Sequence, residues 1–215
     1  MHGAIERFGL YLVMTAPRTS YVECAEAAVK AGVRYVQLRH KPAPRAEVVA
    51  AGREVAAVVR GSKTLFIVDD DPEAAVECGA DGVHLGQTDM SVPEARARFP
   101  GLSVFGLSTH SPEQAAAAVA AAPDYCGVGP VFKTPTKAIP DPVLGPRAAG
   151  AIIAAAPFTT VAIGGINAGN LAEVLAAGAI NFAVVRDVCL SPAPYDAIRR
   201  LQDVWLEAQA ASPRR

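Results

Sequence analysis

The chain has 215 residues, of which 20 are Lys or Arg and 21 are Asp or Glu, and its formal net charge at pH 7 is −1. This balance excludes a polybasic nucleic-acid-binding protein, and a mean hydropathy of +0.24 excludes a disordered chain. No uninterrupted run of about eighteen apolar residues occurs, so we predict no membrane span. The length fits one globular domain with a full hydrophobic core.

Short apolar runs alternate with alanine-rich stretches of helical period throughout the chain. The apolar runs are rich in Val, Ile, Leu and aromatic residues, which is typical of strands buried on both faces. In chain order, the predicted strands are Leu10–Met14, Tyr35–Leu38, Leu65–Val68, Gly82–Leu85, Ser103–Leu107, Tyr125–Val128, Thr160–Ile163 and Phe182–Val185.

The predicted helices lie between these strands and after the last one. Several begin at a capping serine followed by proline and an acidic residue, as at Ser91 and Ser111, and several end on glycine. In chain order, they are Val22–Ala31, Arg45–Val59, Pro72–Cys78, Val92–Phe99, Pro112–Ala121, Pro146–Ala155, Ala168–Ala177 and Tyr195–Ala210.

Eight strand–helix units predict an α/β fold with a parallel sheet, and the leading interpretation is a closed (β/α)8 TIM barrel. A doubly wound open sheet is the alternative, because the number of strands does not show closure. No linker or low-complexity tract divides the chain. We therefore predict one domain over residues 1–215, with a loose C-terminal tail from about residue 211.

The four cysteines, Cys24, Cys78, Cys126 and Cys189, are far apart and form no C-x-x-C pair. The first residues, MHGAIERFG, lack the charged and then apolar pattern of a signal peptide. These features predict buried, reduced thiols rather than disulfides or a zinc site, and a cytoplasmic protein.

Every predicted strand ends in polar residues, which is where a TIM barrel carries its chemistry. Among them, Arg39, Lys41 and the later Lys137 are cations suited to a phosphate or diphosphate. Asp70 and Asp89 follow neighbouring strands and offer the oxygen ligands that Mg²⁺ takes beside substrate phosphates. In the alternative interpretation, these charges only pair with one another at a polar rim.

The remaining strand ends allow both functional and structural interpretations. Asp71 fits a turn and helix cap before a proline, while His84 and His110 fit hydrogen-bonded rim residues better than catalytic bases. The Gly164-Gly165 turn, which we expect to open a helix, favours a phosphate site over a simple tight connection. The segment 130–144 is long enough for a lid or binding loop, and a surface excursion is the alternative.

These motifs together resemble those of the thiamine-phosphate synthase family, over roughly residues 11–191. The family joins a pyrimidine diphosphate to a thiazole phosphate. The resemblance implies that the QLR-x-K motif holds the diphosphate, with Asp69 nearby and with Asp70 and Asp89 as Mg²⁺ ligands. The motif consists of Gln37, Leu38, Arg39, His40 and Lys41.

The same resemblance implies a second group of residues around the thiazole phosphate. The T-x-T-K motif supplies Thr134, Pro135, Thr136 and Lys137, and further contacts come from Gly165, Val185 and Arg186. Lys41, Ser108 and Lys137 are implied as the catalytic residues that stabilise the departing diphosphate, with Mg²⁺ as the cofactor. The expected partners are small-molecule substrates, without nucleic acid or membrane, and the chain is compatible with a homo-oligomer.

Two positions depart from the family pattern: Asp69 stands where Asn is usual, and Arg186 stands where Ser is frequent. A related thiazole tautomerase is the closest alternative function, with His110 as its acid–base residue. A non-catalytic thiazole-phosphate-binding module is the second alternative. Retention of Asp70, Asp89 and Lys41 favours the synthase over both.

Overall fold

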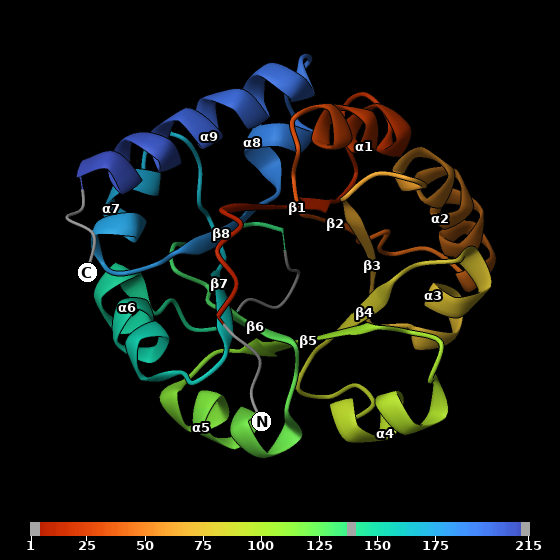
Figure 1. Ribbon diagram of the computed structural model, residues 1–215, viewed down its shortest axis with the longest axis horizontal. Helices are drawn as coiled ribbons and strands as arrows, with labels where there is room; N and C mark the ends of the chain where they lie inside the picture. The colour runs from red at the N-terminus through yellow and green to blue at the C-terminus, as the bar shows by residue number, and fades with distance from the viewer. Residues whose placement is uncertain (1–4, 137–140, 212–215) are drawn as a thin grey trace.

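The computed structural model describes residues 5–136 and 141–211, and it forms a closed barrel of eight parallel strands in the order β1 to β8 (Figure 1). Strand β1 closes the barrel by pairing with β8, with Leu12 opposite Val184. The strands are β1 Leu10–Met14, β2 Tyr35–Leu38, β3 Leu65–Asp69, β4 Gly82–Leu85, β5 Val104–Thr109, β6 Tyr125–Val128, β7 Thr159–Ala162 and β8 Asn181–Val184.

The helices form an outer ring around this barrel (Figure 1). They are α1 Tyr21–Lys30, α2 Arg45–Val59, α3 Pro72–Cys78, α4 Val92–Arg98, α5 Pro112–Ala121, α6 Gly145–Ala155, α7 Leu171–Ala176, α8 Arg186–Cys189 and α9 Pro194–Ala211. Helix α3 is capped by Asp71, whose carboxylate accepts a hydrogen bond of 2.9 Å from the N–H of Ala74. The predicted capping role of Asp71 is therefore confirmed.

The predicted TIM barrel is confirmed, and the open sheet is not observed. Several elements begin or end one residue away from their predicted bounds, and three differ by more. Strand β5 continues through Ser108 to Thr109, and α7 begins only at Leu171, because residues 164–170 form a turn in which the side chain of Asn170 bonds the carbonyl of Gly165 at 2.9 Å. Helix α8 was not predicted, since four residues are too short to show a helical period.

The hydrophobic core has two layers, because successive side chains of a strand point to opposite faces. Tyr11 and Ile67 point into the barrel, where they form a cluster with Tyr35, Val104, Tyr125 and Val161. Leu12 and Phe66 point outward and are buried beneath the helices. All four cysteines are buried and unpaired by disulfides, as predicted.

The amino end of the barrel is filled by the segment that precedes β1. The ring of Phe8 packs edge-on against Tyr35 at 4.8 Å between centroids, and the Tyr35 hydroxyl donates to Glu6 at 2.8 Å. The amide oxygen of Asn181 accepts from the N–H groups of Phe8 and Gly9 at 2.8 and 3.0 Å. Polar, accessible space is thus left at the opposite, carboxyl end.

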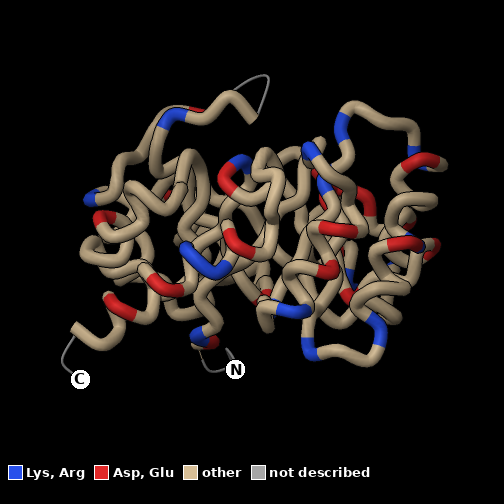
Figure 2. Tube along the Cα trace, turned by 90° about the horizontal axis from the view of Figure 1, so that it is seen from above, with Lys and Arg blue, Asp and Glu red and all other residues tan. Residues whose placement is uncertain are grey.

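Positively and negatively charged residues are interspersed along the trace, in agreement with the nearly neutral net charge (Figure 2). Within the ranges that the structure describes, no helix has the length and apolar character needed to cross a membrane.

Candidate active site

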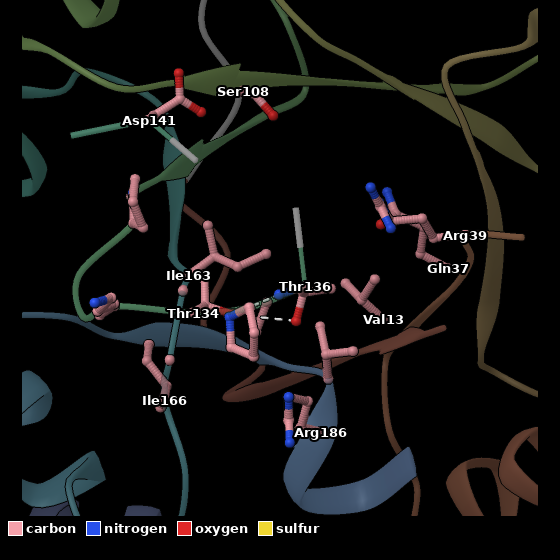
Figure 3. A pocket seen from close by; sticks show the side chains of 18 of the residues that line it. Val13, Gln37, Arg39, Ser108, Thr134, Thr136, Asp141, Ile163, Ile166 and Arg186 are labelled. Carbon is pink, nitrogen blue, oxygen red and sulfur yellow. Dashed lines mark hydrogen bonds between the residues drawn. The ribbon is translucent and has the colours of Figure 1, made fainter. Parts of the chain in front are cut away.

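A cavity of about 470 Å³ opens at the carboxyl end of the barrel (Figure 3). Its wall includes residues from all eight strands or from the loops that follow them, as expected for a TIM-barrel active site. The polar residues of the wall are Gln37, Arg39, Asp69, His84, Ser108, His110, Lys133, Thr134, Thr136, Asp141, Asn167, Arg186 and Asp187.

One side of the site is a cluster of cations and carboxylates after β2 and β3. Asp69 accepts from Arg39 at 3.3 Å and from Lys41 at 3.2 Å, and Lys41 also contacts Asp70. Arg39 and Asp69 line the cavity, and Lys41 joins Asp69 to Asp70 beside it. The structure thus brings together four residues that the sequence assigned to diphosphate and metal binding.

The carboxyl of Asp69 is only 10% exposed, and its pKa is raised from 3.8 to about 6. Burial is the largest cause, and the neighbouring charge of Asp70 adds to it. Lys41 and Arg39 act in the opposite direction but do not compensate fully. Asp69 does not cap α3, because Asp71 takes that role.

Asp70 and Asp89 lie next to one another across the ends of β3 and β4. Asp70 has a left-handed backbone, with a φ of 61°, and its N–H donates to the carbonyl of His84 at 2.8 Å. One oxygen of Asp89 accepts from the N–H of Gly86 at 2.7 Å. Burial raises the pKa of Asp89, and the adjacent Asp70 raises it further.

This donor set fits Mg²⁺. No cluster of three or more His, Cys, Asp and Glu side chains suited to a metal occurs among residues 5–136 and 141–211, so the described residues offer a pair of carboxylates, Asp70 and Asp89, rather than a complete cage. Mg²⁺ characteristically takes one or two carboxylates and fills its remaining positions with water and substrate phosphate. Two adjacent carboxylates also repel one another, and a divalent cation would relieve that repulsion.

Ser108 stands at the cavity wall with its side chain bonded to a histidine. Its Oγ lies 2.9 Å from Nε2 of His84, and its carbonyl accepts from the side chain of Gln87 at 2.6 Å. Figure 3 shows Ser108 and Arg186 on opposite sides of the cavity. Since β5 extends further than predicted, Ser108 is held within the sheet rather than in a loop.

The other side of the site consists of the loop after β6 and the turn after β7. The N–H groups of Val131 and Phe132 donate to the carbonyls of Ile163 and Gly164 at 2.8 and 2.9 Å, which joins the two segments. Gly165 has a φ of +68°, and a Cβ there would lie 2.7 Å from that of Phe132. Only glycine allows this close approach.

The hydroxyls of Thr134 and Thr136 lie 3.1 Å apart near the centre of the view in Figure 3. The Gly164-Gly165 turn does not open a helix as expected, because α7 starts only at Leu171. The turn itself still lines the cavity beside these hydroxyls, so a phosphate site there stays a prediction.

Two cations of the cavity wall, Lys133 and Arg186, have no ion pair within the described residues. The three acidic side chains of the wall are all engaged: Asp69 with Arg39, Asp141 with His110, and Asp187 with the N–H of Ala168 at 2.9 Å. The sequence motifs give no role to Lys133, although this residue directly precedes the T-x-T-K motif. Both cations are available to an anionic ligand.

The remaining predicted residues lie at different depths. Gln37 is buried and lines the cavity, which the exposed Pro135 and the half-buried Val185 also line. Leu38 is buried beneath the helices, and the ring of His40 lies 3.1 Å from the Tyr21 hydroxyl; neither lines the cavity. Lys137 lies outside the described residues.

His110 is held by two acceptors rather than poised as a base. Its Nδ1 lies 2.7 Å from the carbonyl of Gly129, and its Nε2 lies 3.4 Å from Asp141. This arrangement ties the loop after β6 to β5, and it agrees with the prediction of a hydrogen-bonded rim histidine.

A sequence model of the thiamine monophosphate synthase family matches residues 10–188. The chain belongs to this family. It is 36% identical over 203 residues to thiamine-phosphate synthase of Methanospirillum hungatei, covering 93% of this chain and 98% of the relative. It is 42% identical to the Thermus thermophilus enzyme, over 90% of this chain and 95% of that protein.

The comparison with solved structures leads to the same family. Thiamine phosphate pyrophosphorylase from Pyrococcus furiosus superposes with a TM-score of 0.84 at 32% identity, covering 94% of this chain and 97% of that structure. The resemblance stated from the motifs is therefore confirmed, and it extends over the whole barrel.

Proposed function

We propose that the protein joins the two halves of thiamine phosphate in the cavity at the carboxyl end of its barrel. It is a transferase of thiamine biosynthesis whose substrates are small molecules, hydroxymethylpyrimidine diphosphate and thiazole phosphate. The observation that carries the assignment of the site is the presence of two separate anion-binding groups around one cavity: the Arg39–Lys41 side and the Lys133–Arg186 side.

The first group suits the diphosphate. Arg39 and Lys41 bring positive charge, and Ser108 brings a hydroxyl from the adjoining part of the wall. Asp70 and Asp89 would hold Mg²⁺, which stabilises negative charge on phosphate oxygens when bound. Lys137 is assigned here from the T-x-T-K motif.

The second group suits the phosphate of the thiazole. Thr134 and Thr136 supply hydroxyl donors, Gly165 and the first residues of α8 supply backbone N–H groups, and Arg186 and Lys133 supply charge. The apolar side chains of Ile163 and Ile166 line the same cavity, on the left of the view in Figure 3, and they offer apolar surface to the faces of the two rings.

The reaction needs charge stabilisation rather than a protein nucleophile. The bond between the pyrimidine methylene carbon and the diphosphate oxygen breaks, and its electron pair leaves with the diphosphate. The thiazole nitrogen then donates its lone pair to the resulting pyrimidine cation to form the new C–N bond. The protein holds the two reacting atoms in line and receives the departing charge on Arg39, Lys41 and Ser108.

The thiazole tautomerase is not favoured. An isomerase requires an acid–base residue facing the ring, whereas His110 is engaged with Gly129 and Asp141. The retained carboxylate pair also has no role in such a reaction.

We also propose that the enzyme works in the cytoplasm, since its four buried free cysteines fit a reducing compartment. The homo-oligomer with which the sequence is compatible stays a prediction.

The direct test is to incubate the purified protein with both substrates and Mg²⁺. Thiamine phosphate and diphosphate should appear in equal amounts, and excess chelator should abolish both. Each of Asp70→Ala and Asp89→Ala should lower kcat by about 10²-fold or more while thiazole-phosphate binding persists. Conversion of thiazole phosphate in the absence of the pyrimidine would instead support the tautomerase, and full activity in chelator would refute the metal site.

A further inference from the structure

Four polar side chains form a continuous hydrogen-bonded chain through the barrel interior. The Tyr11 hydroxyl lies 2.7 Å from that of Tyr125, which lies 3.0 Å from Nδ1 of His84. On the other side of the ring, Nε2 of His84 lies 2.9 Å from Oγ of Ser108 at the cavity wall. The chain thus connects a buried tyrosine on β1 to the active site through β6, β4 and β5.

The direction of these hydrogen bonds follows from counting protons. If Tyr11 donates to Tyr125, then Tyr125 donates to Nδ1, the N–H on Nε2 donates to Ser108, and the serine proton is left facing the cavity. If Ser108 donates to Nε2 instead, every bond reverses and the Tyr11 proton is left over. If both ring nitrogens of His84 are protonated, the Tyr11 proton is again left without an acceptor.

Burial decides between the two directions. Tyr11 is 2% exposed, and the described residues offer its hydroxyl no partner beyond Tyr125. A buried hydroxyl proton without an acceptor costs free energy, whereas a serine proton at the cavity wall can bond water or substrate. The first direction therefore satisfies every buried group, and it requires a neutral His84 with its proton on Nε2.

We propose that His84 is a positioning residue that turns the hydroxyl proton of Ser108 toward the substrate. Phosphate oxygens are acceptors, so the departing diphosphate needs a donor at this wall. A serine that donated to His84 would present lone pairs to the anion instead. The role given to Ser108 rests on the proposed function, whereas the hydrogen-bond direction does not.

The packing around His84 holds the ring in this orientation. Its ring stacks on Tyr125 at 5.4 Å between centroids with an interplanar angle of 26°. Gly106 provides the space for both rings, because a Cβ at that position would lie 2.3 Å from the Tyr125 ring and 2.5 Å from Nδ1 of His84. A ring that is stacked on Tyr125 and bonded at both nitrogens keeps one tautomer.

The first test is spectroscopic and uses the unliganded protein. ¹⁵N-labelled histidine should show, at neutral pH, a neutral ring protonated on Nε2, assigned to His84 by its disappearance in His84→Gln. A ring protonated on Nδ1, or on both nitrogens, would overturn the proposal whatever the enzyme activity.

The second test compares His84→Gln with His84→Leu. The Gln amide keeps a donor for Ser108 and an acceptor for Tyr125, while Leu keeps neither. His84→Leu should lower kcat by about 10- to 100-fold with little change in the KM for thiazole phosphate, and Gln should restore most of the loss. Equal activity of the two variants contradicts the proposal. Val83→Ala, on the outward face of β4, controls for damage to the strand.

A double-mutant cycle separates action through Ser108 from a general structural effect. Ser108→Ala should lower kcat by about 10²-fold, and adding His84→Leu or His84→Gln should lower it by less than about threefold more. Losses that multiply in the double variants would overturn the positioning role. If the wild-type protein makes no thiamine phosphate, the proposed function fails, and the tautomer measurement still decides the direction of the hydrogen bonds.

Discussion

Asp69 is the residue at which this chain departs most clearly from its family pattern, and its environment opposes its charge. The folded-state pKa of about 6 exceeds the ordinary 3.8, so the folded protein binds this proton more tightly than the unfolded chain does. Stability therefore falls as the pH rises through the window from about 4 to 6. Above about pH 6, the ionised carboxylate destabilises the metal-free fold by roughly 1–3 kcal/mol relative to its protonated form.

We predict that Asp69→Asn raises the melting temperature of the metal-free protein at pH 7.5. The gain should shrink as the pH falls toward 4, because the wild-type carboxyl is then protonated as well. Thermal unfolding in chelator across this pH range measures the difference. A gain that stays constant with pH would show that the charge of Asp69 is not its cause.

Lys133 and Arg186 supply charge at the opposite side of the cavity. Each of Lys133→Ala and Arg186→Ser should raise the KM for thiazole phosphate roughly tenfold with little change in kcat, because a charge-assisted hydrogen bond to the phosphate is lost. The increase should be smaller at high salt. Lys63→Ala removes an exposed cation elsewhere and serves as the control. An unchanged KM in both variants would place the phosphate elsewhere.

At the scale of elements, the contact between the loop after β6 and the turn after β7 shapes the thiazole side. We predict that Gly165→Ala weakens thiazole-phosphate binding about tenfold or more, because its methyl group would meet Phe132 and the carbonyl of Lys133, 2.8 Å away, at a positive φ. Isothermal titration with thiazole phosphate measures the loss. Gly101→Ala is the matched control, since nothing lies within 4 Å of its Cβ position, and its affinity should match the wild type.

The elements themselves differ in how far their sequence predicts them. Buried strands are predictable because an apolar run bounded by turn residues is a local signal, and helices α4 and α5 are predictable from the serine caps at Ser91 and Ser111. Helix α8 has four residues and no period, and the start of α7 depends on the bond from Asn170 to Gly165. The link between His84 and Ser108 depends on the register of β4 and β5, where His84 lies opposite Gly106. Such contacts between strands cannot be predicted from the sequence of either strand alone.

At the scale of the whole molecule, residues that stabilise the fold lie at the amino end of the barrel, and residues of the candidate active site lie at the carboxyl end. Asn181 belongs to the amino end, where it is 1% exposed and bonds four backbone groups: the N–H groups of Phe8 and Gly9, and the carbonyls of Glu6 and Thr160. The cavity and all its wall residues lie at the other end. Loss of Asn181 should therefore affect the fold and spare the reaction.

We predict that Asn181→Ala lowers the free energy of unfolding by about 2–4 kcal/mol, since it leaves four backbone groups without their side-chain partner, two of them in buried and two in part-buried hydrogen bonds. For a chain of this length the melting temperature should fall by roughly 4–12 °C. At 25 °C, well below the transition, kcat and both KM values should stay within about twofold of the wild type. Urea unfolding and steady-state kinetics on the same preparation test both parts, with Glu26→Ala on the exposed face of α1 as a surface control. A large loss of kcat in a folded Asn181→Ala protein would show that the two ends of the barrel are coupled.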